Sequence, residues 1–400
     1  MTTEKITIEP VTRIEGHAKI TIRMNDDGTV NHAYFHVNEF RGFEKFCEGR
    51  MVFEMPFITP RICGICPVSH HLAAAKAGDE VLGCPPPRTA TLLRDLMHMG
   101  QIIQSHGMHF FELAGPDLIL GFDADPAVRN VVGLLQADPG LTLKAINLRK
   151  FGQDIIFRVG GRRIHPTFAV PGGVNKALSA EDRAGILAGL DEAIATTQLG
   201  ISIMKGWAEK NREDIEKFAV LKTGYFGMVT PGNGLELYDG QIRLLDQKGQ
   251  QLEHFDGSNY LDYIAEHVES WSYLKFPYYK KMGWPNGVYR VGPLGRLNAA
   301  DVIETPLAGE EMKIWKSLNG GLPVENTLYY HYARMVEVLF ALERVRVLLD
   351  DPDILGKDIL NPRHDFRGEG VGIIEAPRGT LFHHYWANES GQLARVNLIV

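Results

Sequence analysis

The chain has 400 residues, enough for one large domain or two ordinary ones around a sizeable core. Hydrophobic residues make up 44% and charged residues 23%, as in soluble globular proteins. The net charge of −7, with no basic run, excludes the electrostatic footprint of a nucleic-acid partner. The N-terminus shows no signal segment, and no stretch approaches the ~20 apolar residues of a transmembrane helix. We therefore expect a soluble, cytoplasmic protein without a membrane span.

Strands are predicted for the first forty residues. Segments 6–8 and 18–22 alternate apolar and polar side chains, which is the period of a strand with one buried face. The turn sequence at residues 25–28 separates the second segment from another at residues 30–37. This pattern predicts a hairpin.

Helices are predicted to dominate the middle of the chain. Apolar residues recur at helical spacing over residues 89–113 and 325–349. Ser179, with Asp182 three positions later, resembles a capping box, which predicts a helix toward Lys217. Between residues 224 and 295 the sequence is rich in Gly, Pro and aromatic residues, so we expect an irregular region with short strands.

Strands return near the C-terminus, at residues 371–375, 380–385 and 393–400. Since there is no repeat or linker, residues 1–400 are predicted to form a single α+β domain, with a mainly helical core between N-terminal and C-terminal strands. The last strand has no polar cap, and we expect the natural chain to continue beyond Val400.

The strongest signal for chemistry is the segment RICGICPVSH at residues 61–70. Two residues separate Cys63 from Cys66, and the two sulfurs can point at one metal ion if a turn or a first helical turn follows. Gly64 allows the backbone to approach what the sulfurs hold. On a helix, His70 would lie above the Cys66 sulfur and could donate a hydrogen bond to it.

Spacing alone leaves other interpretations open. In the cytoplasm, four cysteines are expected as reduced thiols that act as ligands or redox groups. A structural zinc site needs a second pair, which Cys47 and Cys84 could supply only at irregular spacing. A thioredoxin-like pair requires a βαβ setting that the sequence lacks, and two buried thiols remain possible. Other segments of the sequence are needed to choose among these interpretations of the cysteine pair.

Five segments, in order, resemble the motifs of nickel–iron hydrogenase large subunits. The resemblance runs from about residue 5 to the last residue, and five ordered matches are far more specific than one cysteine pair. The matching segments are TRIEGH at 12–17, RGFE at 41–44, the cysteine segment at 61–70, SHGMHF at 105–110 and EAPRGT at 375–380.

The resemblance implies the hydrogenase large-subunit fold and the reversible, heterolytic cleavage of dihydrogen into a hydride and a proton at a nickel–iron centre, after which the electrons leave through an iron–sulfur partner subunit. In the family four thiolates hold this centre and the iron carries carbon monoxide and cyanide. By resemblance, Cys63 would be a terminal nickel ligand and Cys66 would bridge the two metals. The family's second cysteine pair is missing, because no cysteine follows Cys84. We expect that pair beyond Val400.

The resemblance also assigns roles near the centre. Glu15 would relay protons, although a surface glutamate at a strand end is the alternative. Arg378 would hang over the open metal position and Pro377 would shape the pocket around the diatomic ligands; here the alternative is an ordinary turn. Asp117 would match the acidic partner of that arginine. Glu44 would bind a magnesium ion.

Competing explanations exist for the remaining polar residues. A salt bridge from Glu44 to Arg41 or Lys45 competes with the magnesium role. His106 and His109 are expected to be core histidines with hydrogen-bond partners rather than metal ligands.

Segments 67–76 and 378–385 look most like the cytoplasmic, NAD-linked bidirectional hydrogenases. In that group the partners are a diaphorase module and an iron–sulfur small subunit, which carry the iron–sulfur clusters, FMN and NAD. Consistently, this chain has no Gly-x-Gly-x-x-Gly motif. Deazaflavin- and viologen-reducing hydrogenases are close alternatives. The catalytically silent quinone-pocket subunit of complex I is a rival: the cysteine pair argues against it, and the missing second pair argues for it.

Overall fold

The structure is a computed structural model that describes residues 5–400, and its contacts divide the chain into two compact units. The first unit comprises the described residues up to Phe46 together with Leu261–Val288. The second comprises Cys47–Tyr260 and Tyr289–Val400. The single domain predicted for residues 1–400 stays a prediction, and each unit is described by itself.

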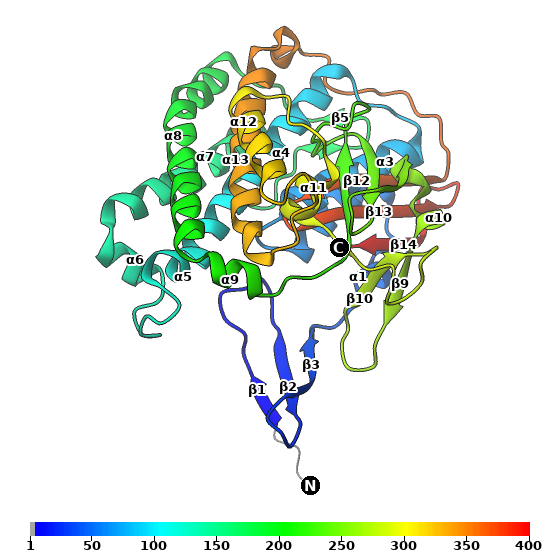
Figure 1. Ribbon diagram of the computed structural model, residues 1–400. Helices are drawn as coiled ribbons and strands as arrows, with labels where there is room; N and C mark the ends of the chain where they lie inside the picture. The colour runs from blue at the N-terminus through cyan, green and yellow to red at the C-terminus, as the bar shows by residue number, and fades with distance from the viewer. Residues whose placement is uncertain (1–4) are drawn as a thin grey trace. The chain divides into compact units, whose positions relative to one another are not determined.

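The first unit is built from two antiparallel groups of strands. One sheet has the order β1-β2-β3, and the predicted hairpin is its β2–β3 pair (Figure 1). The other group is a β9–β10 hairpin. The His36 ring contacts the Trp271 carbonyl at 2.8 Å, and this contact joins the two groups. The bounds are β1 Lys5–Ile8, β2 Lys19–Met24, β3 Val30–His36, β9 Ile264–Val268 and β10 Lys275–Tyr279; the short helices α1 (Phe43–Cys47) and α10 (Tyr260–Tyr263) lie at the boundaries.

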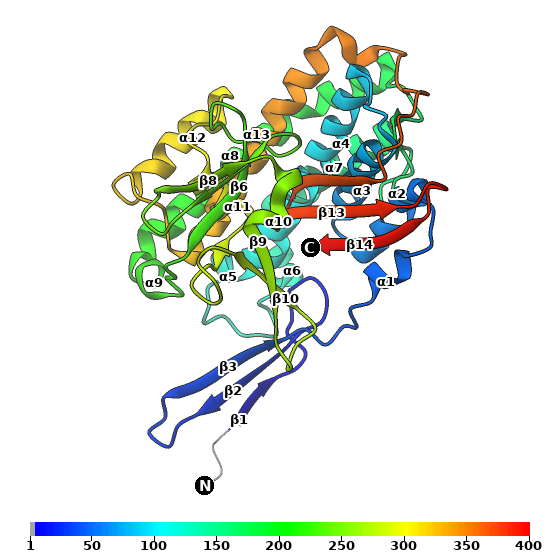
Figure 2. The same cartoon turned by 90° about the vertical axis from the view of Figure 1, so that its right-hand side faces the viewer.

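A bundle of long helices forms the core of the second unit. Helix α4 is buried on almost every side, because α7 and α13 pack against it, and α8 packs on both of these neighbours. Figures 1 and 2 show these helices side by side. The apolar residues of α4 are covered on all sides, and this helix also buries polar residues, among them Arg94, Gln101 and His106, which have hydrogen-bond partners. The bounds are α3 Pro67–Leu82, α4 Arg88–Met108, α7 Pro139–Gly160, α8 Ala180–Lys210 and α13 Tyr330–Asp350.

Three predicted helices have different ends in the structure. The helix predicted to reach residue 113 changes at His109 into a π-helix, His109–Ala114. The helix capped by Ser179 ends at Lys210, because the Asn211 side chain bonds the Trp207 carbonyl at 2.8 Å, and α9 (Arg212–Lys217) follows. The helix predicted from residue 325 starts as the 3-10 turn Thr327–Tyr329 before α13.

The predicted C-terminal strands form one antiparallel sheet, β12-β13-β14, which lies against α3 (Figure 2). Gly372 makes this close approach possible, since a Cβ atom there would lie 2.0 Å from the Ala73 carbonyl oxygen of α3. Strands β12 and β13 pair up to Ala376 and Gly379, so the two strands are joined by a two-residue turn. The bounds are β12 Glu369–Ala376, β13 Gly379–Ala387 and β14 Leu393–Ile399.

A second sheet, β11-β6-β7-β8, contains the other short strands predicted between residues 224 and 295, besides the β9–β10 hairpin of the first unit, and α11 packs on it. The mixed α+β class is confirmed. Within residues 5–400 no helix is both long and apolar enough to span a membrane. The remaining bounds are β4 Ala169–Val170, β5 Gly173–Val174, β6 Gly224–Val229, β7 Gln241–Leu245, β8 Gln251–Phe255, β11 Tyr289–Arg290, α2 Met55–Ile58, α5 Gly115–Leu120, α6 Val131–Ala137, α11 Gly292–Ala299 and α12 Pro306–Ser317, with 3-10 turns at Val52–Glu54, Thr59–Ile62, Gly257–Asn259 and Pro352–Leu355.

Candidate metal centre

The two cysteines of the candidate centre lie on the loop that leads into α3. Cys66 is the N-cap residue of this helix, and Pro67 occupies the first helical position, where its fixed φ fits and its missing N–H costs nothing. The Cys66 backbone N–H donates to the Cys63 Sγ at 3.2 Å, which folds the loop into a tight turn. The turn brings the two sulfurs together, as the spacing predicted.

A hydrogen bond joins the two thiols and shifts their pKa values in opposite directions. A hydrogen bond from the Cys66 thiol, with help from the Arg378 charge, lowers the pKa of Cys63 to about 6. The same hydrogen bond and burial raise the pKa of Cys66, because it keeps the proton of the pair. At neutral pH one of the two sulfurs is therefore a thiolate, which is the form that binds metals.

Arg378 reaches this thiolate from the tip of the turn between β12 and β13. Its Nη2 donates to the Cys63 Sγ at 3.5 Å. Pro377 is the other turn residue and is buried. The predicted arginine and cysteine therefore lie together, within the second unit.

His70 belongs to a buried chain of hydrogen bonds. Its Nδ1 lies 3.1 Å from the His383 Nε2, and the His383 Nδ1 lies 2.6 Å from the Tyr385 hydroxyl. Burial lowers the pKa of His70 to about 3, so the ring is neutral. If the Tyr385 hydroxyl donates to the His383 Nδ1, the His383 Nε2–H donates in turn to the His70 Nδ1. His70 then carries its own proton on Nε2. The predicted bond to the Cys66 sulfur stays a prediction.

Helix α4 supports the cysteine loop from below. The side-chain amides of Gln101 and Gln104 both donate to the Ile65 carbonyl at 2.9 Å. Ile65 lies between the two cysteines, so these bonds fix the loop against the most buried helix of the bundle. Neither glutamine was predicted as part of the site, although two amides on one face of a helix could have indicated a backbone-binding role.

Other missed residues form a buried charged cluster below the Arg378 turn. Arg296, Glu337 and Glu375 have 0% exposed side chains and are joined by ion pairs. His106 bonds Glu337 at 2.8 Å, and it therefore has the partner expected of a core histidine. The available signal was a single charged residue, Arg296, within the otherwise uncharged α11 sequence GPLGRLNA.

Asp117 has another partner, and His109 lacks one of the hydrogen bonds that were expected of a core histidine. Asp117 pairs with Arg129 at 3.5 Å, and its pairing with Arg378 stays a prediction. His109 has no hydrogen-bond partner at Nδ1 within the described chain, and its ring lies 5.7 Å from that of His331.

Glu15 and Glu44 belong to the first unit. Glu15 is exposed on the segment between β1 and β2. Glu44 accepts a hydrogen bond from the Arg41 guanidinium at 2.9 Å and lies 3.8 Å from the Lys275 ammonium. The competing salt bridge to Arg41 is therefore present. The proton-relay and magnesium roles of these residues stay predictions.

The two cysteine sulfurs supply part of the ligand set that a centre of soft metals requires. Thiolates are the ligands that nickel and iron accept in redox sites, and the pair supplies two of the four that the family's centre uses. Among residues 5–400 no group of three or more His, Cys, Asp or Glu side chains gathers to hold a metal. Cys47 and Cys84 are within this range, so the four-cysteine zinc alternative has no geometric support.

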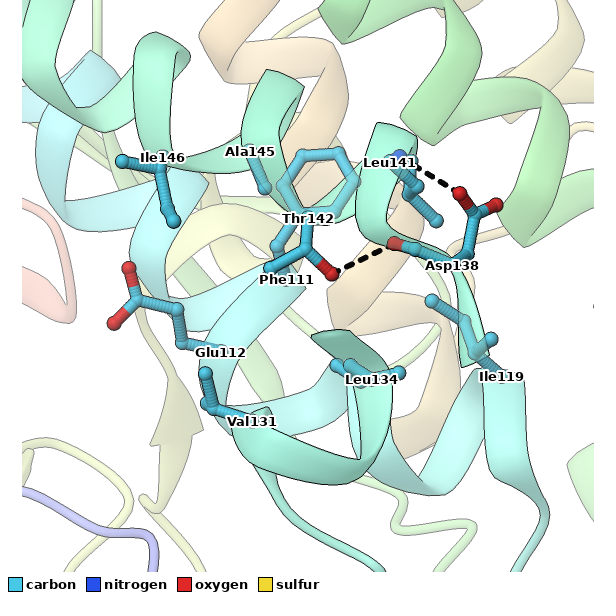
Figure 3. A pocket seen from close by; sticks show the side chains of 10 residues that line it. All are labelled: Phe111, Glu112, Ile119, Val131, Leu134, Asp138, Leu141, Thr142, Ala145 and Ile146. Atoms are coloured by element: carbon cyan, nitrogen blue, oxygen red, sulfur yellow. Dashed lines mark hydrogen bonds between the residues drawn. The ribbon is translucent and has the colours of Figure 1, made fainter. Parts of the chain in front are cut away.

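An apolar pocket lies elsewhere in the second unit, between the π-helix, α6 and α7 (Figure 3). Asp138 at its edge caps α7 by accepting from the Leu141 backbone N–H at 2.9 Å. No candidate site residue lines it. The lining residues are Phe111, Glu112, Ile119, Val131, Leu134, Asp138, Leu141, Thr142, Ala145 and Ile146.

Comparison with known proteins agrees with this architecture. Residues 5–40 match the family model described as HoxL-like, and residues 41–139 match that of the nickel-dependent hydrogenases. A chain of the F420-non-reducing hydrogenase vhu of Methanococcus voltae is 44% identical over 396 residues, covering 99% of this chain and 94% of the relative. The beta chain of the NAD-reducing hydrogenase HoxS of Cupriavidus necator is 42% identical over 411 residues, covering 99% and 84%. A crystal structure of an NAD+-reducing [NiFe]-hydrogenase in the H2-reduced state superimposes with a TM-score of 0.96 at 43% identity, covering 100% and 89%.

A helical bundle holds a pair of cysteine sulfurs, one of them a thiolate, beside an arginine, and such sulfur ligands suit a metal-dependent redox protein. The chain belongs to the nickel-dependent hydrogenase family, as a large subunit. It is thus an oxidoreductase that acts on hydrogen, and its family supports a nickel–iron centre. The predicted resemblance, fold and enzyme class are confirmed.

Proposed function

We propose that this chain cleaves dihydrogen reversibly at a nickel–iron centre held by Cys63 and Cys66, and that the electrons pass to NAD through partner subunits. The overall reaction is H2 + NAD+ ⇌ NADH + H+: two electrons and one proton reach the nicotinamide, and the second proton is released. The single observation that carries the proposal is the 3.5 Å contact between the Arg378 guanidinium and the Cys63 sulfur.

The chain's own residues prepare the site. Cys63 and Cys66 would hold the metals. The hydrogen bond from the Cys66 thiol, with help from the Arg378 charge, keeps Cys63 ionised, and Arg378 places a fixed positive charge beside it. The bound nickel–iron group would supply an open coordination position at which dihydrogen is polarised and its electrons accepted. Pro377 would line the space for the carbon monoxide and cyanide that we propose on the iron.

Glu15 is our proposed proton carrier. A relay needs an ionisable group that reaches the site by hydrogen bonds, and the family resemblance of segment 12–17 supplies the candidate. Glu44 is the proposed magnesium ligand. For the metal to bind there, Glu44 would have to exchange its bond to Arg41 for the cation.

The partners we propose are a diaphorase module, which carries FMN and binds NAD, together with an iron–sulfur small subunit. Support comes from the 42% identical relative, which is named as part of an NAD-reducing hydrogenase. Because NAD is a carrier of the cytoplasm, we also propose that location. The silent complex I relative is set aside, because the chain belongs to the hydrogenase family and retains its first cysteine pair.

A second candidate is an acceptor other than NAD, of the kind that the viologen assay reports, since the 44% identical relative is named an F420-non-reducing and not an NAD-reducing hydrogenase. To distinguish the two, the complex would be purified from its host and given hydrogen with NAD+, a deazaflavin or a viologen. Reduction of NAD+ at a rate similar to that of viologen supports the diaphorase partner. Reduction of viologen alone by a complex that contains all its subunits would contradict it.

A further inference from the structure

Arg296 has the most completely satisfied guanidinium near the candidate centre. It lies on α11 with a fully buried side chain. Its Nε and Nη2 donate to the two carboxylate oxygens of Glu337 at 2.6 and 2.7 Å, a bidentate pair. Its Nη1 donates to Glu375 at 2.9 Å. A buried cation of this kind requires such partners, because desolvation would otherwise exclude it.

The same guanidinium also holds the backbone that leads to Arg378. Nη1 donates to the Ala376 carbonyl at 2.9 Å, and Nη2 approaches the Pro377 carbonyl at 3.4 Å. These are the two residues directly before Arg378. One side chain therefore connects the interior of the bundle to the turn.

Close backbone contacts hold the turn from its other side. Gly292 has φ = +72°, and a Cβ atom there would lie 2.8 Å from the Arg378 carbonyl oxygen. A Cβ atom on Gly379 would lie 2.6 Å from the Val291 side chain. The start of α11 thus lies against the turn, so Arg296 and its own helix hold the turn together.

The carboxylates around Arg296 are anchored independently. Glu375 accepts from the Met228 backbone N–H at 2.8 Å and from the Thr380 hydroxyl at 2.7 Å. Glu337 is also bonded by the His106 Nε2 at 2.8 Å. Both carboxylates are thus held by groups other than Arg296, and a buried network with all its hydrogen bonds made can fix the position of what it binds.

We infer that Arg296 is a positioning residue: by binding the Ala376 and Pro377 carbonyls, it fixes the turn that places the Arg378 guanidinium over Cys63. This inference rests on the proposed function of Arg378. Arg296 itself touches no reacting group. Its contribution is geometric, and misplacement of a catalytic group by about 1 Å can cost about a hundredfold in rate.

The test compares two buried arginines. Arg296→Lys keeps the positive charge but loses the planar fork, so the carbonyl bonds of the turn cannot all be replaced. Arg94→Lys is the matched control. Arg94 is also fully buried, pairs with Asp79 at 2.5 Å and donates to the Val170 carbonyl at 2.7 Å, but it makes no contact with the turn.

Two readouts are needed. In the full-length chain without metal, hydrogen–deuterium exchange is followed for peptides that cover residues 371–387. In the mature complex, kcat and KM for hydrogen are measured. For Arg296→Lys we expect at least about tenfold faster exchange in these peptides and at least about a tenfold lower kcat, with KM within about twofold. Arg94→Lys should leave both within about twofold.

Unchanged exchange at residues 371–387 in Arg296→Lys would overturn the inference, as would an equal kcat loss in the two variants. If Arg296→Lys does not fold, the charge-neutral pair Arg296→Gln with Glu337→Gln is judged by the same criteria. Failure of the proposed function looks different: Arg378→Lys would then keep full activity, while the exchange effect of Arg296→Lys would remain.

Discussion

The Arg378 guanidinium and the Cys63 sulfur are 3.5 Å apart, although 315 positions separate these residues in the sequence. A two-residue turn brings the arginine, and the loop before α3 brings the cysteine. This contact places a fixed positive charge beside a thiolate, so substitution of either residue should change the activity or the metal content.

Arg378→Lys should lower the hydrogen-dependent kcat by about 10²- to 10³-fold while the bound nickel is unchanged. Lysine keeps the charge but not the fixed, forked donor geometry that electrostatic stabilisation requires. Activity and nickel content are measured on the same preparation. Arg367→Lys is the control, because Arg367 is exposed and pairs with Glu80. Full activity in Arg378→Lys would refute the role.

Cys63→Ser should lower the nickel content of the purified chain by more than about tenfold, since serine is a much poorer ligand for a soft metal. Inductively coupled plasma mass spectrometry gives the metal content. Cys84→Ser serves as control, because Cys84 is buried and belongs to no metal-binding group of the described residues. Equal nickel in the two variants would show that Cys63 is not a ligand.

Glu15→Gln should reduce hydrogen uptake and hydrogen–deuterium gas exchange by about 10²- to 10⁴-fold, because the amide cannot carry a proton. Glu15→Asp should recover part of this loss. Mass spectrometry of the gas phase measures exchange. Glu9→Gln provides the comparison, because Glu9 is half-exposed and pairs with Lys19 at 3.0 Å. The relay is contradicted if Glu15→Gln exchanges at the wild-type rate.

His71 should make the stability of the chain depend on pH. Burial lowers its pKa to about 4, its Nδ1 lies 2.7 Å from the Pro56 carbonyl, and its Nε2 accepts from the Ala169 N–H. The folded pKa is below the unfolded value of about 6.5, so the unfolded state binds the extra proton between these values. His71 alone should therefore lower the free energy of unfolding by roughly 3 kcal/mol as the pH falls from about 6.5 to about 4.

Urea unfolding at several pH values measures this dependence. His71→Gln should be less stable at pH 7 but should lose less stability on acidification, by about 1.4 kcal/mol per pH unit. His32→Gln, at an exposed position, should keep the wild-type slope. An unchanged slope in His71→Gln would show that folding does not lower the pKa of His71.

Local patterns were sufficient for most elements. The β2–β3 hairpin and the strands β12, β13 and β14 follow from alternation and turn residues, and Ser179 does accept from the Asp182 N–H at 3.0 Å. Helix ends were less predictable. The end of α8 depends on the Asn211 side chain, and the change to a π-helix at His109 has no signal in hydrophobic periodicity.

The site also contains residues that the sequence identifies and residues that it does not. Cys63, Cys66 and Arg378 could be named from motifs, and the structure brings them together. Arg296 and Gln101 had only weak signals in the sequence, and the backbone carbonyls that they bind could not be named, because these carbonyls are far away in the sequence. Such contacts are created by tertiary packing, which a single sequence does not display.

The nickel–iron centre is tested most directly by an infrared spectrum of the mature complex in the region of metal-bound carbon monoxide and cyanide. We expect these bands in the native complex and their loss when both Cys63 and Cys66 are replaced by alanine. A native complex without the bands, with all its partner subunits present, would contradict the nickel–iron centre, and so would bands that persist in the double variant.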